Sequence, residues 1–335
     1  MTIHVRLSQG TLLRSVLVLA IFSVACAGCA SAATAIVETA DCTTTGVNAA
    51  LAAATASSTY TAGAPITIQI AAGAVCTEGV VVSGLSNVVL NAVDPTNPPT
   101  FSPSASGLAA LQISNSNNVY VNTINFTGPG TAPGPQVPQI PLVVVQSSNV
   151  VTFAACNFTK ATGTAIQVSS SQVSINGPST IGPNNQNGIS STASNLSIGG
   201  WGPTQAVQIE NNSFDGISVS QGGYLFLYEY VTVSQNGDPT GKNTFAGVAL
   251  GNAEALLCCG NSYGPIVDGN YGWGIDAEEL SGVTIVGGNG PNLSISGNTQ
   301  GGIYVNASWV GIYNGVTVQR NGDNTQTSRW AASTC

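Results

Sequence analysis

The stretch GISVSQGGYLFLYEYVTV, residues 216–233, decides the fold class. It contains three short apolar runs, at 216–219, 224–227 and 231–233, separated by turns of polar residues and glycine. Short runs with alternating apolar positions are typical of β-strands, and none of these runs is long enough to form a helix. The stretch therefore predicts three successive strands that are joined by turns alone.

The same pattern recurs along the chain. An Asn followed by apolar residues begins runs at Asn87, Asn118 and Asn149, at intervals of 31 residues. Further on, a Gly followed by an apolar alternation recurs with spacings of 25, 28, 31, 27 and 28 residues, at Gly163, Gly188, Gly216, Gly247, Gly274 and Gly302. A unit of about 28 residues is repeated, and such a period indicates a solenoid.

Equivalent strands of successive units must pair in parallel without helical crossovers, so the coils stack directly on one another. The inward positions that we expect to fill the bore are Ile217, Val219, Val248, Leu250, Ile275, Ile303 and Val305. Asn also repeats at the end of the third strand, where stacked amides can pass hydrogen bonds from coil to coil. These residues are Asn157, Asn212, Asn236, Asn270, Asn298 and Asn321. The sequence predicts an all-β protein, a single parallel β-helix of about 8 to 9 coils.

Two phrases carry a resemblance to a known family. The run Ile295-Ser296-Gly297-Asn298, followed by Gly302-Ile303-Tyr304-Val305, resembles the parallel β-helix repeats of the pectin-lyase-like superfamily, over roughly residues 64–324. The resemblance implies right-handed coils and a substrate groove along the first strand of each coil. The superfamily includes lyases, hydrolases, epimerases, adhesins and phage tailspikes, so the resemblance specifies the fold and leaves the function open.

The N-terminus predicts export. Arg6 and Arg14 precede an apolar run at 15–25 and small residues that end at Ala32, so we interpret residues 1–32 as a signal peptide. Cleavage by a lipoprotein peptidase before Cys26 or Cys29 is the alternative, and it would leave a lipid anchor. No other apolar segment approaches the roughly 20 residues that a membrane-spanning helix needs. We expect a secreted or cell-surface protein.

The remaining domain boundaries follow from the repeat. Residues 33–63 are expected to form an N-terminal cap with a short helix over the Ala-rich stretch 45–56, residues 64–324 the β-helix and residues 325–335 a C-terminal tail. Cys42 and Cys76 are expected to form a disulfide in the cap, since export permits disulfides. Cys335 is a candidate partner for Cys258 or Cys259. For Cys156 the alternative is a small buried apolar side chain.

Charge excludes one class of partner. The net charge is -8, and the basic residues beyond the leader are Lys160, Lys242, Arg320 and Arg329. These are too few to neutralise a phosphate backbone, so nucleic acid is excluded as a partner. The chain has one His, His4, which lies in the leader, so we expect no zinc site and no chemistry that uses imidazole.

One coil places two carboxylates on the outward face of its first strand. Asp276 and Glu278 are two residues apart, so their side chains share a face with Cβ atoms about 6.5 to 7 Å apart. That separation suits a general acid and a general base that flank a glycosidic bond. The neighbouring residues that we expect to contact a sugar are Tyr271, Trp273, Tyr304, Asn306 and Lys242. No cofactor is required, although a calcium ion held by the two carboxylates is chemically reasonable.

Two functions remain open. The first is a non-catalytic β-helix that binds extracellular polysaccharide, or that serves as an adhesin or envelope component, through its polar outward face. The alternative is a polysaccharide-degrading enzyme, a glycoside hydrolase before a lyase, with Asp276 and Glu278 as acid and base. The motif sets of the polygalacturonases, pectate lyases and mannuronan epimerases are missing from the sequence, which favours the binding protein.

Overall fold

The computed structural model describes residues 36–322, apart from 59, 62, 104–106, 130–138, 241–244, 259–262, 288–292 and 314. The predicted signal peptide and C-terminal tail, the possible anchor residues Cys26 and Cys29, and Lys242, Cys259 and Cys335 lie outside the described residues. Among the described residues, no helix has the length and apolarity needed to span a bilayer.

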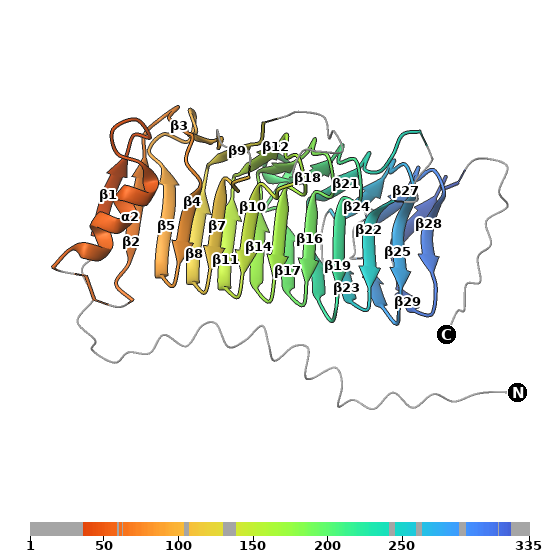
Figure 1. Ribbon diagram of the computed structural model, residues 1–335. Coiled ribbons are helices and arrows are strands. Elements are labelled where there is room, and N and C mark those ends of the chain that lie inside the picture. The colour runs from red at the N-terminus through yellow and green to blue at the C-terminus, as the bar shows by residue number, and fades with distance from the viewer. Residues whose placement is uncertain are drawn as a thin grey trace, which may run out of the picture. The chain divides into compact units, whose positions relative to one another are not determined.

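The described chain forms three parallel sheets, and each coil adds one strand to each sheet in turn. Figure 1 shows the coils stacked in sequence order from the N-terminal to the C-terminal end of the solenoid. Nine coils, from β4–β6 to β28–β30, carry all three strands. This arrangement confirms the predicted all-β parallel β-helix.

Each sheet is named here by its strands. Sheet A contains, in spatial order, β1 (Ile36–Ala40), β2 (Ile66–Ile70), β5 (Ser86–Ala92), β8 (Asn117–Asn122), β11 (Asn149–Ala154), β14 (Gln172–Asn176), β17 (Asn195–Gly199), β20 (Tyr224–Leu227), β23 (Glu254–Cys258), β26 (Gly282–Val286) and β29 (Trp309–Ile312). Sheet B contains β3 (Val75–Cys76), β6 (Thr100–Phe101), β9 (Asn125–Thr127), β12 (Asn157–Thr159), β15 (Ser179–Ile181), β18 (Val207–Glu210), β21 (Val231–Ser234), β24 (Ile266–Asp268), β27 (Leu293–Ser296) and β30 (Val316–Gln319). Sheet C contains β4 (Val80–Ser83), β7 (Leu111–Ser114), β10 (Val143–Gln146), β13 (Ile166–Ser169), β16 (Ile189–Thr192), β19 (Ile217–Ser220), β22 (Ala246–Gly251), β25 (Trp273–Glu278) and β28 (Gly301–Val305).

Helix α2 (Val47–Ala56) lies at the N-terminal end of the solenoid, where the Ala-rich stretch predicts a helix. Its buried residues are Val47, Ala50, Leu51 and Ala54, which belong to the same apolar core as the first coils. The side chain of Asn48 donates a hydrogen bond of 2.9 Å to the Glu78 carboxylate. A disulfide joins Cys42 to Cys76, as expected. A single 3-10 turn, η2 (Pro203–Gln205), lies between β17 and β18.

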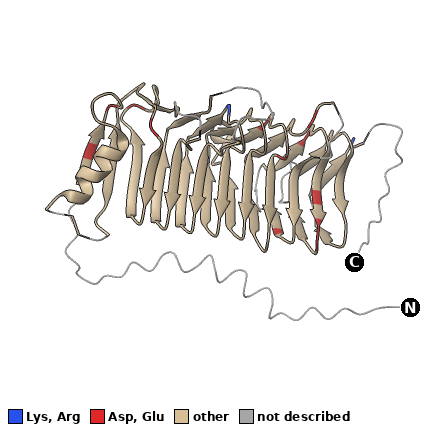
Figure 2. Cartoon of the chain, viewed as in Figure 1, with Lys and Arg blue, Asp and Glu red and all other residues tan. Residues whose placement is uncertain are grey.

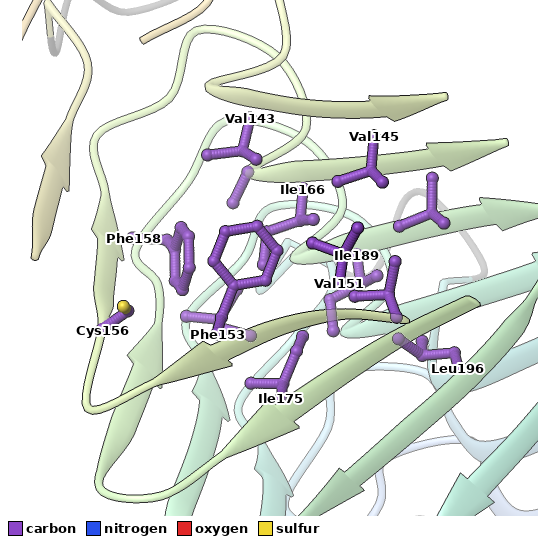
Figure 3. Close-up of a cluster of buried hydrophobic side chains, with 14 of the residues drawn as sticks. Val143, Val145, Val151, Phe153, Cys156, Phe158, Ile166, Ile175, Ile189 and Leu196 are labelled. Carbon is purple, nitrogen blue, oxygen red and sulfur yellow. The ribbon is translucent and has the colours of Figure 1, made fainter. Parts of the chain in front are cut away.

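The bore is filled by apolar side chains from all three sheets. Figure 3 shows a part of the bore in which Phe153 and Phe158 lie with Val143 of the same coil and with Ile166 and Ile175 of the next. The rings of Phe153 and Phe158 meet edge to face at 5.6 Å, a favourable geometry for aromatic pairs. Cys156, a fully buried free thiol, lies in the same part of the bore, which supports the interpretation of Cys156 as a small apolar side chain.

Most of the predicted inward residues are buried, but Val305 is 42% exposed. The buried ones are Ile217, Val219, Val248, Leu250 and Ile275, and Ile303 packs against the core. Val305 belongs to β28, the terminal strand of sheet C among the described residues, so no further described coil covers it. The alternation identified the inward face correctly, and the prediction that Val305 is buried is wrong because of its place in the stack.

The predicted asparagine ladder is present, but one of its residues differs from the prediction. Asn184, Asn212, Asn236, Asn270, Asn298 and Asn321 donate side-chain hydrogen bonds in series, with amide-to-amide distances of 2.8 to 3.0 Å. Asn157 was predicted to belong to this ladder, but it lies at the start of β12, is exposed and pairs with Asn125 instead. The residue that precedes Asn212 in the ladder is Asn184, which the sequence pattern missed.

The ladder explains the repeated glycine. A Cβ atom on Gly216 would lie 2.8 Å from the Asn236 amide nitrogen, and one on Gly247 would lie 2.6 Å from that of Asn270. Real Cβ atoms essentially never approach other atoms so closely. Each glycine precedes the first strand of a coil and leaves space for the side chain of the asparagine that follows the third strand of that coil. The repeated glycine and the repeated asparagine therefore have one steric cause.

Candidate functional site

The outward face of sheet C carries two columns of side chains, one for each outward position that its strands share. The first column pairs Gln167 with Ser190, Ser190 with Ser218, Ser218 with Ala249, Ala249 with Asp276, and Asp276 with Tyr304. In the second column, Gly251 pairs with Glu278. The register therefore places Asp276 between a small alanine and a tyrosine on neighbouring coils.

Asp276 and Glu278 point outward from β25, on either side of the fully buried Ala277. Both carboxylates belong to half-buried residues. The Oδ1 atom of Asp276 is buried and makes no hydrogen bond. Figure 2 shows how sparse acidic and basic residues are along the described solenoid, so a pair of carboxylates on one strand is a local feature.

Burial and neighbouring charge alter how these groups titrate. Burial raises the pKa of Asp276 to about 6, and the charge of Glu278 adds to the shift. Burial also raises the pKa of Asp215 to about 7. The Ala246 N–H donates a hydrogen bond of 2.7 Å to Asp215 and opposes this shift, whereas the negative charge of Asp276 adds to it. These two aspartates therefore hold protons at pH values where ordinary carboxyl groups have lost them.

Asp215 is a site residue that the sequence analysis missed. It lies in the turn before Gly216, two coils before Asp276 in sheet C. Carboxylates in turns are most often solvated, so the position of Asp215 along the chain does not indicate burial. The one sequence feature that distinguishes Asp215 is its position directly before the repeated glycine, Gly216.

Two aromatic rings flank Asp276. The ring centroids of Trp273 and Tyr304 lie 5.0 Å apart, and their planes are inclined at 31°. The indole of Trp273 lies over Gly301, where a Cβ atom would approach it to 2.0 Å. The glycine lets the ring lie against the strand of the next coil, so that both rings and both carboxylates share one face.

Of the other predicted contact residues, Tyr271 and Asn306 are described by the structure, and Lys242 is not. Tyr271 is half-buried in the turn before β25, and its backbone N–H donates a hydrogen bond of 2.8 Å to the Asn236 carbonyl. Asn306 is exposed, and its N–H donates a hydrogen bond to the carbonyl of Ala277, which places it beside β25. Glu279 lies in an exposed turn after β25, with φ of 56°.

The carboxylates do not form a metal-binding cluster. Within the part of the chain that the structure describes, no group of three or more His, Cys, Asp or Glu residues is arranged to hold a metal ion. Two carboxylates, one of them with a raised pKa, are a weak donor set for calcium, which takes six to eight oxygen ligands. The chemistry that this face offers is therefore that of carboxyl groups and aromatic rings.

Comparisons with known proteins give structural likenesses only. No family model matches the chain, and no curated protein matches it. The Dettilon tailspike protein is similar with a TM-score of 0.46 and 13% identity, over 83% of this chain and 59% of the tailspike. The periplasmic alginate epimerase AlgG gives 0.40 and 12%, over 78% of this chain and 64% of the epimerase. The pectin methylesterase from Aspergillus niger gives 0.39 and 13%, over 90% and 89% of the two chains. This chain thus spans less than two thirds of the tailspike and of the epimerase, and likenesses with TM-scores below 0.5 carry no conclusion about this chain.

Proposed function

We propose that the outward face of sheet C binds an extracellular polysaccharide, centred on Asp276. The observation that carries this proposal is the ring pair Trp273–Tyr304 beside a half-buried carboxyl group. The CH-rich faces of a sugar ring bury well against aromatic rings, while carboxyl oxygens accept hydrogen bonds from its hydroxyl groups. The unpaired Oδ1 atom of Asp276 is an acceptor that a bound hydroxyl group would satisfy.

The rest of the column extends this surface along the solenoid. Gln167, Ser190 and Ser218 occupy equivalent outward positions on successive coils. Adjacent coils are about 4.8 Å apart, so the column offers polar groups at a short, regular repeat. A long polymer with a repeating chemical structure is the kind of ligand that such a surface suits.

We place the protein outside the cytoplasm, as a secreted or surface component. The predicted leader at 1–32 and the Cys42–Cys76 disulfide support this location, because disulfides persist in oxidising compartments. A lipid anchor at Cys26 or Cys29 is the alternative to removal of residues 1–32, and retention of the exported protein in membranes would indicate the anchor.

The experiment is retention on a panel of soluble and insoluble polysaccharides. We expect Trp273→Ala to weaken retention about tenfold, which corresponds to about 1.4 kcal/mol, because it removes one face of the ring pair. Tyr120→Ala is the matched control, since Tyr120 is an aromatic residue 38% exposed on β8 of another sheet. Equal retention of both variants on every polysaccharide would contradict binding at this face.

One observation favours catalysis as a second candidate function. With a pKa of about 6, Asp276 holds a proton near neutral pH, as the general acid of a glycoside hydrolase must. Glu278 would then act as the base that activates water or as the nucleophile, depending on the final carboxyl separation. Release of reducing ends by the native protein, lost in Asp276→Asn while retention persists, would establish the hydrolase. Retention without any released product would leave a binding protein.

A further inference from the structure

A second aromatic surface lies on sheet A, away from the Asp276 face. Strand β20 carries Tyr224 and Phe226 on its outward side, and Tyr228 continues this alternation directly after the strand. All three residues are half-buried. The ring centroids of Phe226 and Tyr228 are 3.6 Å apart. Three consecutive outward aromatic residues on one strand form a continuous apolar ridge across the sheet.

Trp309 continues this surface three strands further along the same sheet. Its indole lies over Gly282 of β26, since a Cβ atom on that glycine would lie 2.7 Å from each of three indole atoms. The indole therefore packs against the backbone of Gly282. Trp309 is nevertheless 53% exposed, so much of the indole is open to solvent.

One carboxylate lies between the two groups of rings. The register runs from Tyr224 to Glu254, then to Gly282 and Trp309. Burial raises the pKa of Tyr224, and the negative charge of Glu254 adds to the shift, which shows that the two side chains are close. Glu254 is exposed, so its oxygens are accessible beside the rings.

The charge of this surface limits its ligand. Within β17, β20, β23, β26 and β29, the only charged residue is Glu254. A polyanion would meet a negative charge and no described basic residue of these strands, so a uronate-rich chain is disfavoured. An uncharged sugar can stack on the rings and donate hydroxyl hydrogen bonds to the carboxylate.

We propose that Tyr224, Phe226, Tyr228, Glu254 and Trp309 form a second carbohydrate-binding surface that takes an uncharged polysaccharide. The ligand would run along the stack of coils, from the β20 ridge to the exposed indole of Trp309. The three strand spacings between them correspond to about 14 Å, enough for a short oligosaccharide. This surface does not depend on the proposed function of the Asp276 face, because the two lie on different sheets.

Affinity electrophoresis in a neutral polysaccharide, hydroxyethyl cellulose or galactomannan, with polygalacturonate as the charged comparison, tests the proposal. We expect Trp309→Ala to reduce retardation in at least one of the neutral polymers about tenfold. Gly282→Val should have a similar effect although it keeps the indole, because the new side chain displaces the ring from the strand. Tyr120→Ala on β8 is the control that should retain binding.

Two results would overturn the proposal. The first is unchanged retardation of Trp309→Ala in both neutral polymers, and the second is stronger retardation of the native protein in polygalacturonate than in either of them. Sedimentation of native protein and Trp309→Ala tests the other occupant, a second copy of this chain. A dimer that only the native protein forms, without polysaccharide binding, would also refute it. Far-UV circular dichroism confirms that each variant is folded, and Trp309→Ala keeps the test decisive if Gly282→Val does not fold.

Discussion

Replacing Asn236 by Ala should destabilise the solenoid more than any comparable change at its surface. The Asn236 side chain is fully buried and makes four hydrogen bonds. Its Nδ2 atom donates to the Ile209 carbonyl and the Asn270 Oδ1 atom, both at 3.0 Å. Its Oδ1 atom accepts from the backbone N–H and the side-chain amide of Asn212, at 3.1 and 2.9 Å. The alanine variant removes all four hydrogen bonds at once.

The cost follows from the groups that remain. The buried Asn212 N–H loses its acceptor and the Ile209 carbonyl loses a donor, and each unsatisfied buried group costs about 1 to 3 kcal/mol. The small cavity left by the amide adds to this. We therefore expect Asn236→Ala to lower the free energy of unfolding by about 3 to 5 kcal/mol. Asn321 makes equivalent hydrogen bonds in the last described coil, but it is half-buried and water can replace it, so Asn321→Ala should cost only about 1 kcal/mol.

Urea unfolding followed by far-UV circular dichroism compares the two variants. A solenoid can unfold in segments, so hydrogen exchange of the backbone amides around coil β19–β21 should accompany the urea curves. We expect local loss of protection in Asn236→Ala and near-native protection of the same amides in Asn321→Ala. If the two variants have the same urea midpoint and the same hydrogen-exchange protection, the buried hydrogen bonds of Asn236 do not stabilise the fold.

Three further predictions concern titration, the disulfide and the buried thiol. The pKa values of Asp215 and Asp276 are raised to about 7 and about 6 in the folded state. The folded state therefore keeps protons that the unfolded state releases above about pH 4. The free energy of unfolding should consequently fall as pH rises from about 4 to 7. The double variant Asp215→Asn/Asp276→Asn should show a flatter urea midpoint over that range, and an unchanged slope would contradict the assignment. Removing the Cys42–Cys76 disulfide, which spans 34 residues, should lower stability by about 3 to 4 kcal/mol, and equal melting of Cys42→Ser/Cys76→Ser and native protein would exclude this. Burial raises the pKa of Cys156 to about 12, so a thiol reagent should label it only as the protein unfolds, and rapid labelling in native buffer would show that it is accessible.

The sequence predicts the fold well because the fold has a simple steric rule. Each coil needs a glycine where the asparagine of the next coil packs, and both residues recur at the coil period. The two errors have causes outside this rule. Asn157 matches the residue type and the spacing, but its position at the start of β12 turns its side chain to solvent. Val305 has the inward phase, but a repeat pattern does not show that no further described coil covers it.

The candidate site was predicted only in part. Strand alternation alone puts Asp276 and Glu278 on one face, and the coil period puts Tyr304 beside them. Asp215 was missed because its interaction with Asp276 crosses two coils and its raised pKa depends on burial. The surface around Trp309 was missed for the same reason, since rings from strands three coils apart become neighbours only when the register is known.

The two surfaces share coils, and this has a physical consequence. β25 carries Asp276 on sheet C, and β26, the next strand of the same coil, carries the Gly282 on which Trp309 lies. Between them, Ile275 and Ile285 are fully buried in a close-packed bore, which holds the two faces at a fixed separation. Trp273 and Tyr304 belong to sheet C and Trp309 to sheet A, so ligands on the two faces should bind independently, with additive free energies. If the proposed surfaces on sheets A and C both bind polysaccharide, the rigid solenoid would join two polysaccharide chains without bending. Its effect on a polymer network would then come from the fixed separation of the two faces and not from high affinity at either face.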